Sequence, residues 1–144
     1  MLLWLLPSVA LADDDLITLR SPHSVPVTVQ RLQEALQADG WTIFATLDQA
    51  ARAAEHGAKI RARTTIIVAC MADYAMYLIA RPTIAIDGPH RVLVWEDDEG
   101  VWVTRNSLRH QLRNVVNRHE AKGIGFAPQF VDDKLTAAID SVMR

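Results

Sequence analysis

The sequence predicts a two-layer α+β domain in which helices pack against an antiparallel sheet of about five strands. Short runs rich in β-branched and aromatic residues alternate with segments that have the apolar spacing of helices. Two of these runs, residues 90–96 and 101–105, are separated by a four-residue turn, which predicts a β-hairpin. A chain of 144 residues, 50% of them hydrophobic, is long enough for one domain with a real core and too short for two comfortable ones.

The N-terminal third predicts a strand, a helix and a second strand. Residues 13–20 end in the strand-like run LITLR. A helix follows between Ser24, a good N-cap residue, and Gly40, a good helix terminator, with Pro26 tolerated in its first turn. Residues 41–47, WTIFATL, are rich in aromatic and β-branched side chains and predict the next strand.

The middle of the chain predicts a short helix and a buried strand. Asp48 caps an alanine-rich helix that stops at Gly57. Residues 63–70, RTTIIVAC, are apolar on both alternating faces, as in a strand buried on both sides. A helical turn or two is predicted for residues 71–80, and residues 81–89 are predicted to be loop-like.

The hairpin of residues 90–105 is predicted to have no polar face. With residues 97–100 as its loop, Trp95 lies directly opposite Trp102, an aromatic cross-strand pair. The other face carries four valines: Val92, Val94, Val101 and Val103. Helices of this chain can cover one face, whereas the second needs more helices, another subunit or a ligand.

Two further helices are predicted, at residues 107–122 and 129–143, with a linker between them. In the first helix, one apolar stripe contains Leu108, Leu112, Val115 and Val116. At 100° per residue His119 falls inside this stripe, whereas His110 points to the polar face. Basic residues gather around the same helix, and we interpret them as a solvated face: Arg105, Arg109, Arg113, Arg118 and Lys122.

The N-terminus has the features of an export signal. The first twelve residues, MLLWLLPSVALA, carry no charge and are followed by DDD. Ala10-Leu11-Ala12 fits the small-x-small pattern that signal peptidase recognises. We expect residues 1–12 to be the remnant of a signal peptide cleaved before Asp13, and residues 13–144 to form a single domain in the periplasm or outside the cell. The apolar run is too short to be a stable membrane span, which needs about 20 residues.

Several classes of chemistry lack support in the sequence. The net charge of −2 gives no bulk signal for a nucleic-acid partner or for a membrane surface. His119-Glu120 begins like the zinc motif HExxH, but Gly123 replaces the second histidine, and the five histidines show no paired ligand spacing. Cys70, the only cysteine, lies in an apolar run where a thiol is usually inert. Asp87, in AIDGPHR, is typical of a turn residue but could also orient a base or bind a ligand.

The order of motifs resembles the family called domain of unknown function 302. The resemblance rests on SPHSVPVTVQRLQEALQADGW, then AIDGPHRVLVWEDDEGVWVT, then VVNRHEAKG, and it covers roughly residues 16–122. It implies a compact α+β domain with an antiparallel sheet that forms a homodimer. By position, His119 matches the late histidine of the family, and Asp87 matches its turn aspartate.

The resemblance also suggests a cofactor, haem b, held through a single axial histidine. His119 would then be the metal ligand, with Asp87 as a second cofactor-binding residue. The alternative for His119 is a neutral core or interface histidine with a satisfied hydrogen bond. Because no CxxCH motif occurs, such a haem would be non-covalent. The chain departs from the family at Ala69-Cys70-Met71, where a Gly-Asn-Pro run is usual, and at His90, where leucine is usual.

Three functions follow from the sequence. The first is an exported, non-enzymatic protein that binds a small apolar ligand, with haem as the sharpest candidate. The second is a dimeric interaction domain without a cofactor. The third is an enzyme that uses His119 as a general base with Asp87 or Glu120 nearby.

Overall fold

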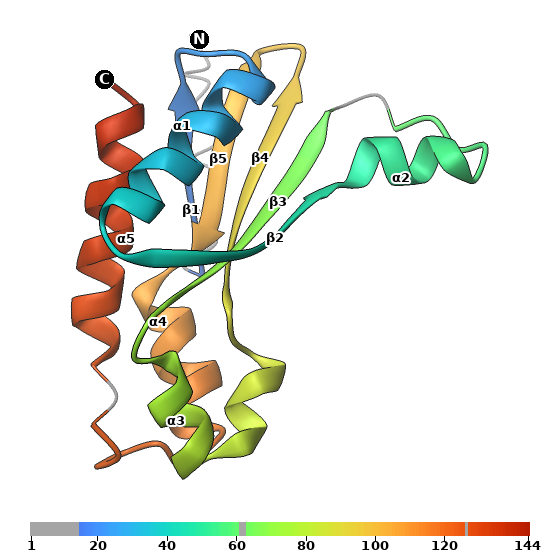
Figure 1. The fold of residues 1–144 in the computed structure, drawn as a ribbon. Coiled ribbons are helices and arrows are strands. Elements are labelled where there is room, and N and C mark those ends of the chain that lie inside the picture. The colour runs from blue at the N-terminus through green and yellow to red at the C-terminus, as the bar shows by residue number, and fades with distance from the viewer. Residues whose placement is uncertain (1–14, 61–62, 126) are drawn as a thin grey trace, which may run out of the picture.

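The computed structural model describes residues 15–60, 63–125 and 127–144, and within them it forms a five-stranded antiparallel sheet (Figure 1). The strand order is β1-β5-β4-β3-β2. The strands are β1 (Leu16–Ser21), β2 (Trp41–Asp48), β3 (Thr64–Met71), β4 (His90–Asp97) and β5 (Gly100–Asn106). All five lie where the sequence predicts them, so the α+β fold class is confirmed.

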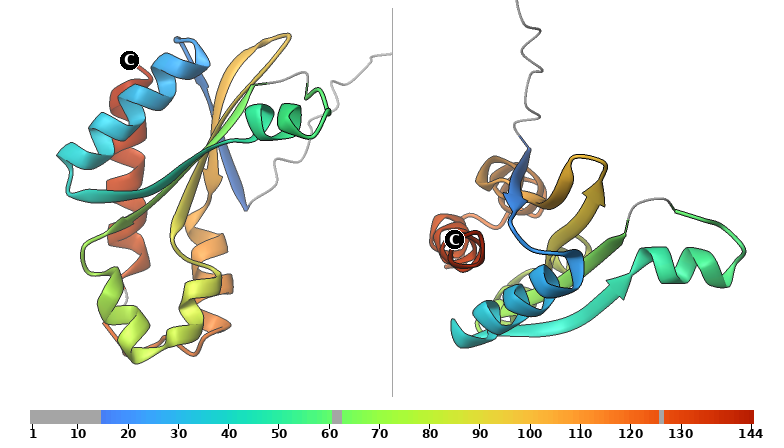
Figure 2. Two further views of the ribbon diagram at one scale, coloured as in Figure 1. Left: turned by 45° about the vertical axis from the view of Figure 1, so that its right-hand side comes forward. Right: turned by 90° about the horizontal axis from the view of Figure 1, so that it is seen from above.

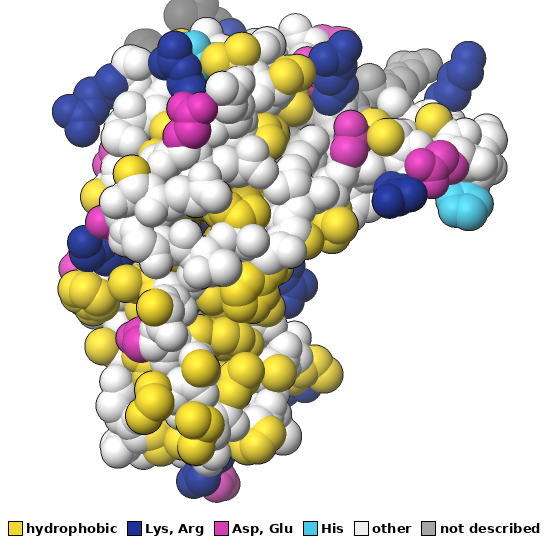
Figure 3. All heavy atoms as spheres, in the orientation of Figure 1, with side chains coloured by type: hydrophobic (Ala, Val, Ile, Leu, Met, Phe, Trp, Pro, Cys, Tyr) yellow, Lys and Arg dark blue, Asp and Glu magenta, His cyan; other side chains and the backbone are white. Residues whose placement is uncertain are grey.

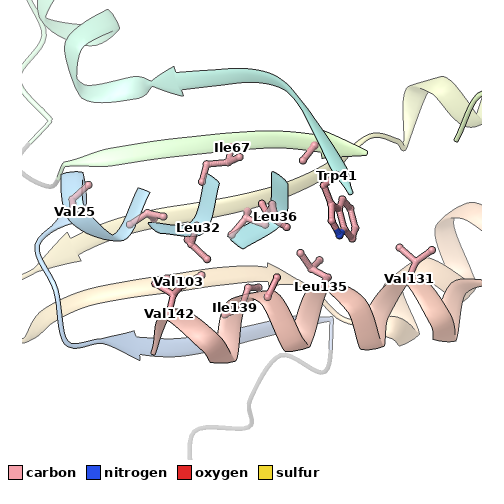
Figure 4. Close-up of a cluster of buried hydrophobic side chains, with 14 residues drawn as sticks. Val25, Leu32, Leu36, Trp41, Ile67, Val103, Val131, Leu135, Ile139 and Val142 are labelled. Atoms are coloured by element: carbon pink, nitrogen blue, oxygen red, sulfur yellow. The ribbon is translucent and has the colours of Figure 1, made fainter. Parts of the chain in front are cut away.

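The two long helices cover one face of the sheet and form the main core with it. The helices and helical turns of the described residues are α1 (Val25–Ala38), α2 (Gln49–Glu55), α3 (Tyr74–Ala80), η1 (Pro82–Ile86), α4 (Leu108–Gln111), η2 (Leu112–Asn117) and α5 (Pro128–Val142). Leu32 and Leu36 of α1 pack with Ile139 of α5 over Val92 and Val103 of the sheet (Figure 4). This arrangement follows from the apolar spacing of both helices and the alternation of the strands.

The hairpin has the predicted register. Trp95 lies opposite Trp102, with their ring centroids 6.2 Å apart, and Val94 lies opposite Val103 on the core face. Each indole N–H has its own acceptor: Trp95 Nε1 donates to Thr104 Oγ1 and Trp102 Nε1 to Asp97 Oδ1, both at 2.9 Å. The indoles are therefore fixed by hydrogen bonds as well as by stacking.

The opposite face of the sheet carries apolar side chains that are only partly buried. Leu47, Ile66 and Leu93 lie in one row across β2, β3 and β4, beside the Trp95–Trp102 pair. Next to this outer face, α2 stands away from the core as an arm, and none of its seven residues is buried (Figure 2). Among the described residues, the two long helices α1 and α5 both lie on the inner face.

A second, smaller core lies below the sheet in the view of Figure 1. Tyr77 of α3 and Ile84 of η1 pack against Val115 of η2 and Ala121. The prediction of a loop for residues 81–89 is wrong in part, because residues 82–86 form the 3₁₀ helix η1. Pro82 at its start has a backbone angle that is already suited to a helical turn.

The predicted helix of residues 107–122 is not one regular α-helix. After the four residues of α4, the chain widens into the π-helix η2. The wider turn changes which side chains face inward: Leu112, predicted to be buried, is 42% exposed, whereas Gln111 is buried. His119 is buried as predicted.

The predicted signal-peptide remnant, residues 1–12, lies outside the described residues. Among the residues that the structure describes, none of the helices has the length and apolar character needed to cross a bilayer.

We predict that Trp95 and Trp102 stabilise the hairpin as a coupled pair. Each replacement by alanine should lower the free energy of unfolding by about 1–3 kcal/mol, because the indoles are half-buried and a fully buried one would cost more. Urea unfolding of the two single variants and the double variant should give a coupling energy of about 0.5–1.5 kcal/mol. Strictly additive losses would contradict the pairing.

Candidate functional site

His119 bridges the two ends of the η1 segment. Its ring is 5% exposed, and with a proton on Nε2 it donates to Asp87 Oδ2 at 2.6 Å. The other nitrogen, Nδ1, then accepts a hydrogen bond from the Thr83 hydroxyl at 2.9 Å. Thr83 lies near the start of η1 and Asp87 directly after its end, so one side chain fastens the whole turn to the segment that follows η2.

Asp87 is held from a second side as well. Arg118 Nη1 lies 3.1 Å from Oδ1 and 3.0 Å from Oδ2 of this carboxylate. The structure therefore brings together the two residues that the sequence singled out, His119 and Asp87, and adds Arg118 and Thr83 to them. We call these four residues the His119 clamp.

The His119 clamp does not fit an axial haem ligand. Iron needs a nitrogen lone pair, but Asp87 Oδ2 lies 2.6 Å from Nε2 and the Thr83 hydroxyl lies 2.9 Å from Nδ1, so both ring nitrogens already have partners. Among the described residues, no group of three or more His, Cys, Asp or Glu side chains is arranged to hold a metal ion.

A small cavity lies beside the clamp, at the junction of the two hydrophobic cores. Its volume is about 30 Å³, room for one or two water molecules. It is lined by Cys70, Tyr74, Tyr77, Asp87, His90 and Gln111, among others. We call it the α3 pocket, because Tyr74 and Tyr77 of α3 form one of its walls.

The hydroxyl of Tyr74 is the unusual group in the α3 pocket. Its oxygen is buried and has no hydrogen-bond partner among the described residues. Burial raises the pKa of this phenol, with a further contribution from the nearby Cys70. Gly88 packs closely against the ring of Tyr74. A Cβ atom at residue 88 would lie 2.5 Å from Tyr74 Oη, so a larger residue there would clash with the tyrosine.

Two further polar groups of the α3 pocket, His90 and Cys70, are neutral at neutral pH. Burial, with a contribution from the charge of Arg105, lowers the pKa of His90 to about 4. His90 Nδ1 lies 3.3 Å from the amide nitrogen of Gln111, and its ring meets Trp41 edge to face. Burial raises the pKa of the Cys70 thiol to about 12, which agrees with the expected inert cysteine.

Two residues of this pocket carried no recognisable signal in the sequence. Gln111 falls beside the apolar stripe of a regular α-helix, and it turns inward where the π-helix begins. Tyr74 belongs to an apolar run in which an aromatic residue predicts packing rather than an unpaired hydroxyl.

The basic residues around residues 105–122 are largely paired. Arg105 is 5% exposed and donates to Asp132 Oδ1 at 2.6 Å and to Thr136 Oγ1 at 2.6 Å, which ties β5 to α5. Arg113 pairs with Asp15, and Arg118 with Asp87. The predicted solvated face therefore contains one buried ion pair, Arg105–Asp132, whereas Arg113 and Arg118 remain more than half exposed in their pairs.

Comparison with known proteins gives a family and a fold. The family model described as "Domain of unknown function DUF302" matches residues 17–142. A solved structure of an uncharacterised conserved DUF302 protein from Bacillus stearothermophilus superposes with a TM-score of 0.75 at 16% identity, over 88% of this chain and 97% of that chain.

Two longer proteins match this chain over part of their own length. A protein of Brucella suis biovar 1 (strain 1330), named fluoride-specific ion channel FluC 1, is 33% identical over 112 residues, 74% of this chain and 44% of its own. A protein of Brucella melitensis biotype 1 (strain 16M), named fluoride-specific ion channel FluC 2, is also 33% identical, over 74% of this chain and 42% of its own length. The chain thus spans less than half the length of these relatives.

The family match covers nearly all of the described residues, and the solved DUF302 structure has the same fold. The chain therefore belongs to the DUF302 family.

Proposed function

We propose that this chain is an exported, non-enzymatic domain that binds a small neutral molecule in the α3 pocket. The observation that carries the proposal is the buried Tyr74 hydroxyl, which has no described partner although it lies in a cavity. A buried donor left without a partner costs about 1–3 kcal/mol, so a ligand with a hydrogen-bond acceptor would gain a prepared contact there.

The charges around the pocket favour a neutral ligand. Asp73 accepts a hydrogen bond from Tyr77 at 3.0 Å, and Asp87 is held by the His119 clamp, so both carboxylates are already engaged. An anion would meet these two negative charges and an uncharged His90. Most of the remaining wall is apolar, including Ile84, Val115 and Val131.

The same geometry favours binding over catalysis. A general base needs a free lone pair within reach of a substrate, and both ring nitrogens of His119 are already engaged, by Thr83 and by Asp87.

Methanol, a neutral molecule of two heavy atoms whose oxygen can accept a hydrogen bond, suits a cavity of about 30 Å³ and tests the pocket. We predict that an NMR titration shifts backbone signals of residues 70–77, 84–90 and 111–115. Tyr74→Phe should weaken methanol binding by about 2–10-fold, because one hydrogen bond is lost and the ring is kept. Methane, which accepts no hydrogen bond, should bind both proteins alike. Methanol shifts elsewhere, or none at all, would refute the site.

Haem is the most specific ligand that the sequence suggests, and a titration of the purified protein with haem tests it. We expect no Soret band from the wild type, since the His119 clamp leaves no nitrogen for iron. A Soret band that His119→Ala abolishes and His110→Ala keeps would overturn this view and restore the axial-ligand role.

We also propose a homodimer that buries the outer face of the sheet, where Leu93 lies between Ile66 and the tryptophan pair. Light scattering after size exclusion should give about twice the chain mass. Leu93→Lys should yield a monomer because it places a charge in the interface, whereas Val27→Lys, on the exposed side of α1, should remain dimeric. A wild-type monomer at tens of micromolar would contradict the proposal.

Export rests on the Ala10-Leu11-Ala12 junction. When the full-length gene is expressed, mass spectrometry should find a mature N-terminus at Asp13 in the periplasmic or secreted fraction. An uncleaved cytoplasmic product would show that the junction is not processed.

A further inference from the structure

His90, the first residue of β4, lies where the two hydrophobic cores meet. Its ring meets the ring of Trp41, a residue of the main core labelled in Figure 4, edge to face, with the centroids 5.5 Å apart. His90 also forms part of the wall of the α3 pocket, together with Tyr77 of the second core. Between the sheet and α3, hydrophobic side chains cover much of the face shown in Figure 3. A charge on His90 would therefore act on both cores.

A permanent positive charge lies beside His90 in the sheet. Val92 is opposite Arg105 in the pairing of β4 with β5, so His90, two residues earlier in β4, is the diagonal neighbour of Arg105 on the same face. The guanidinium of Arg105 is buried and already donates to Asp132 and Thr136 of α5. A second positive charge on His90 would have to share Asp132 with Arg105.

The other titratable groups of the α3 pocket have partners of their own or are uncharged. Asp73 of α3 is exposed and accepts a hydrogen bond from Tyr77 at 3.0 Å, and Asp87 is held by the His119 clamp. Burial raises the pKa of three further groups, which therefore keep their protons at neutral pH: Cys70, Tyr74 and Tyr77. A proton on His90 thus adds an unbalanced charge to the pocket wall.

Gln111 of α4 contacts the nitrogen of His90 that would take up this proton. Its amide nitrogen lies 3.3 Å from His90 Nδ1. An amide nitrogen only donates, so Nδ1 carries the lone pair in this contact. A proton added to Nδ1 ends this hydrogen bond and leaves the buried amide of Gln111 in need of another acceptor. The contact between β4 and α4 is therefore weakened together with the contact between the cores.

We infer that His90 is an acid-sensitive gate of the α3 pocket: a proton on its ring loosens the junction of the two cores and lets a small molecule enter or leave. The passage of a ligand rests on the proposed function of the pocket, whereas the opening rests on the surroundings of His90. In an exported domain, such a gate responds to the pH outside the cytoplasm.

Acid favours the open form because the closed form resists protonation. Burial, with a contribution from the charge of Arg105, lowers the pKa of His90 to about 4 from its ordinary value of 6.5. In the open form the ring meets water, and its pKa returns towards the ordinary value. The open form gains protons first, so the ratio of open to closed protein rises as the pH falls from about 6.5 to about 4. With these two pKa values, the open fraction should increase about 20-fold between pH 7 and pH 5.

Cys70 reports the opening in the protein without any ligand. It is the only cysteine of the chain, is 1% exposed and lines the α3 pocket. Its reaction with dipyridyl disulfide is measured at pH 7 and pH 5, each relative to the urea-unfolded chain at the same pH. We expect the relative rate of wild type to rise about 20-fold at pH 5, because labelling follows the open population when closing is fast.

Matched variants assign the effect to His90. His90→Leu and His90→Gln have no proton to gain, so their relative rates should change by less than about threefold. Two substitutions are used so that a folded one is in hand if the other does not fold. His56→Leu, at the exposed end of the α2 arm, should respond to pH like wild type.

A second reporter separates local opening from unfolding of the whole chain. Val94 of the main core is fully buried, and Val94→Cys in a Cys70→Ala background places the thiol there. Labelling at this position should not accelerate at pH 5 as labelling of Cys70 does.

Three results would overturn the gate. They are equal relative rates for wild type at both pH values, the same acceleration in the two His90 variants, and the same acceleration at the Val94→Cys reporter. If Cys70 opens in acid as expected while methanol binds at neither pH, the gate stands and the proposed ligand site fails.

Discussion

The bridge that His119 forms between Thr83 and Asp87 is the contact on which the lower half of the molecule depends. It fastens both ends of η1, and Asp87 is followed at once by Gly88, whose backbone supports the ring of Tyr74. One buried imidazole therefore holds the segment that carries Ile84, Asp87 and Gly88, which form part of the wall of the α3 pocket. Arg118 reinforces the same carboxylate from the more exposed side.

The need for a polar clamp follows from the unequal size of the two cores. The main core contains the long helices and four strands, whereas the second core has four buried residues: Tyr77, Ile84, Val115 and Ala121. So little apolar area gives the second core a small share of the stability, and a buried hydrogen-bonded pair adds what packing does not supply. A cavity between two cores is also a place where a ligand can enter by a small local movement.

The features that were predicted correctly from the sequence are those that depend on residues close together in the chain. The alternation of residues 90–105 gave the strands and the pairing of Trp95 with Trp102, and helical spacing placed His119 inward. It could not show that both nitrogens of His119 have partners, because Thr83 and Asp87 lie 36 and 32 residues away. Gln111 was missed for another reason: the widening of a helix into η2 has no clear sequence signature, and it exchanges Gln111 for Leu112 at the buried surface.

Hydrogen–deuterium exchange of wild type and His119→Ala tests the clamp most directly, with His110→Ala as the control on the same segment. If His119 fastens η1, the loss of its ring should increase exchange in residues 74–90 and leave β4 and β5 beyond that segment as protected as in wild type. His110→Ala should leave both regions unchanged. Unaltered protection of residues 74–90 in His119→Ala would contradict the central role of the clamp.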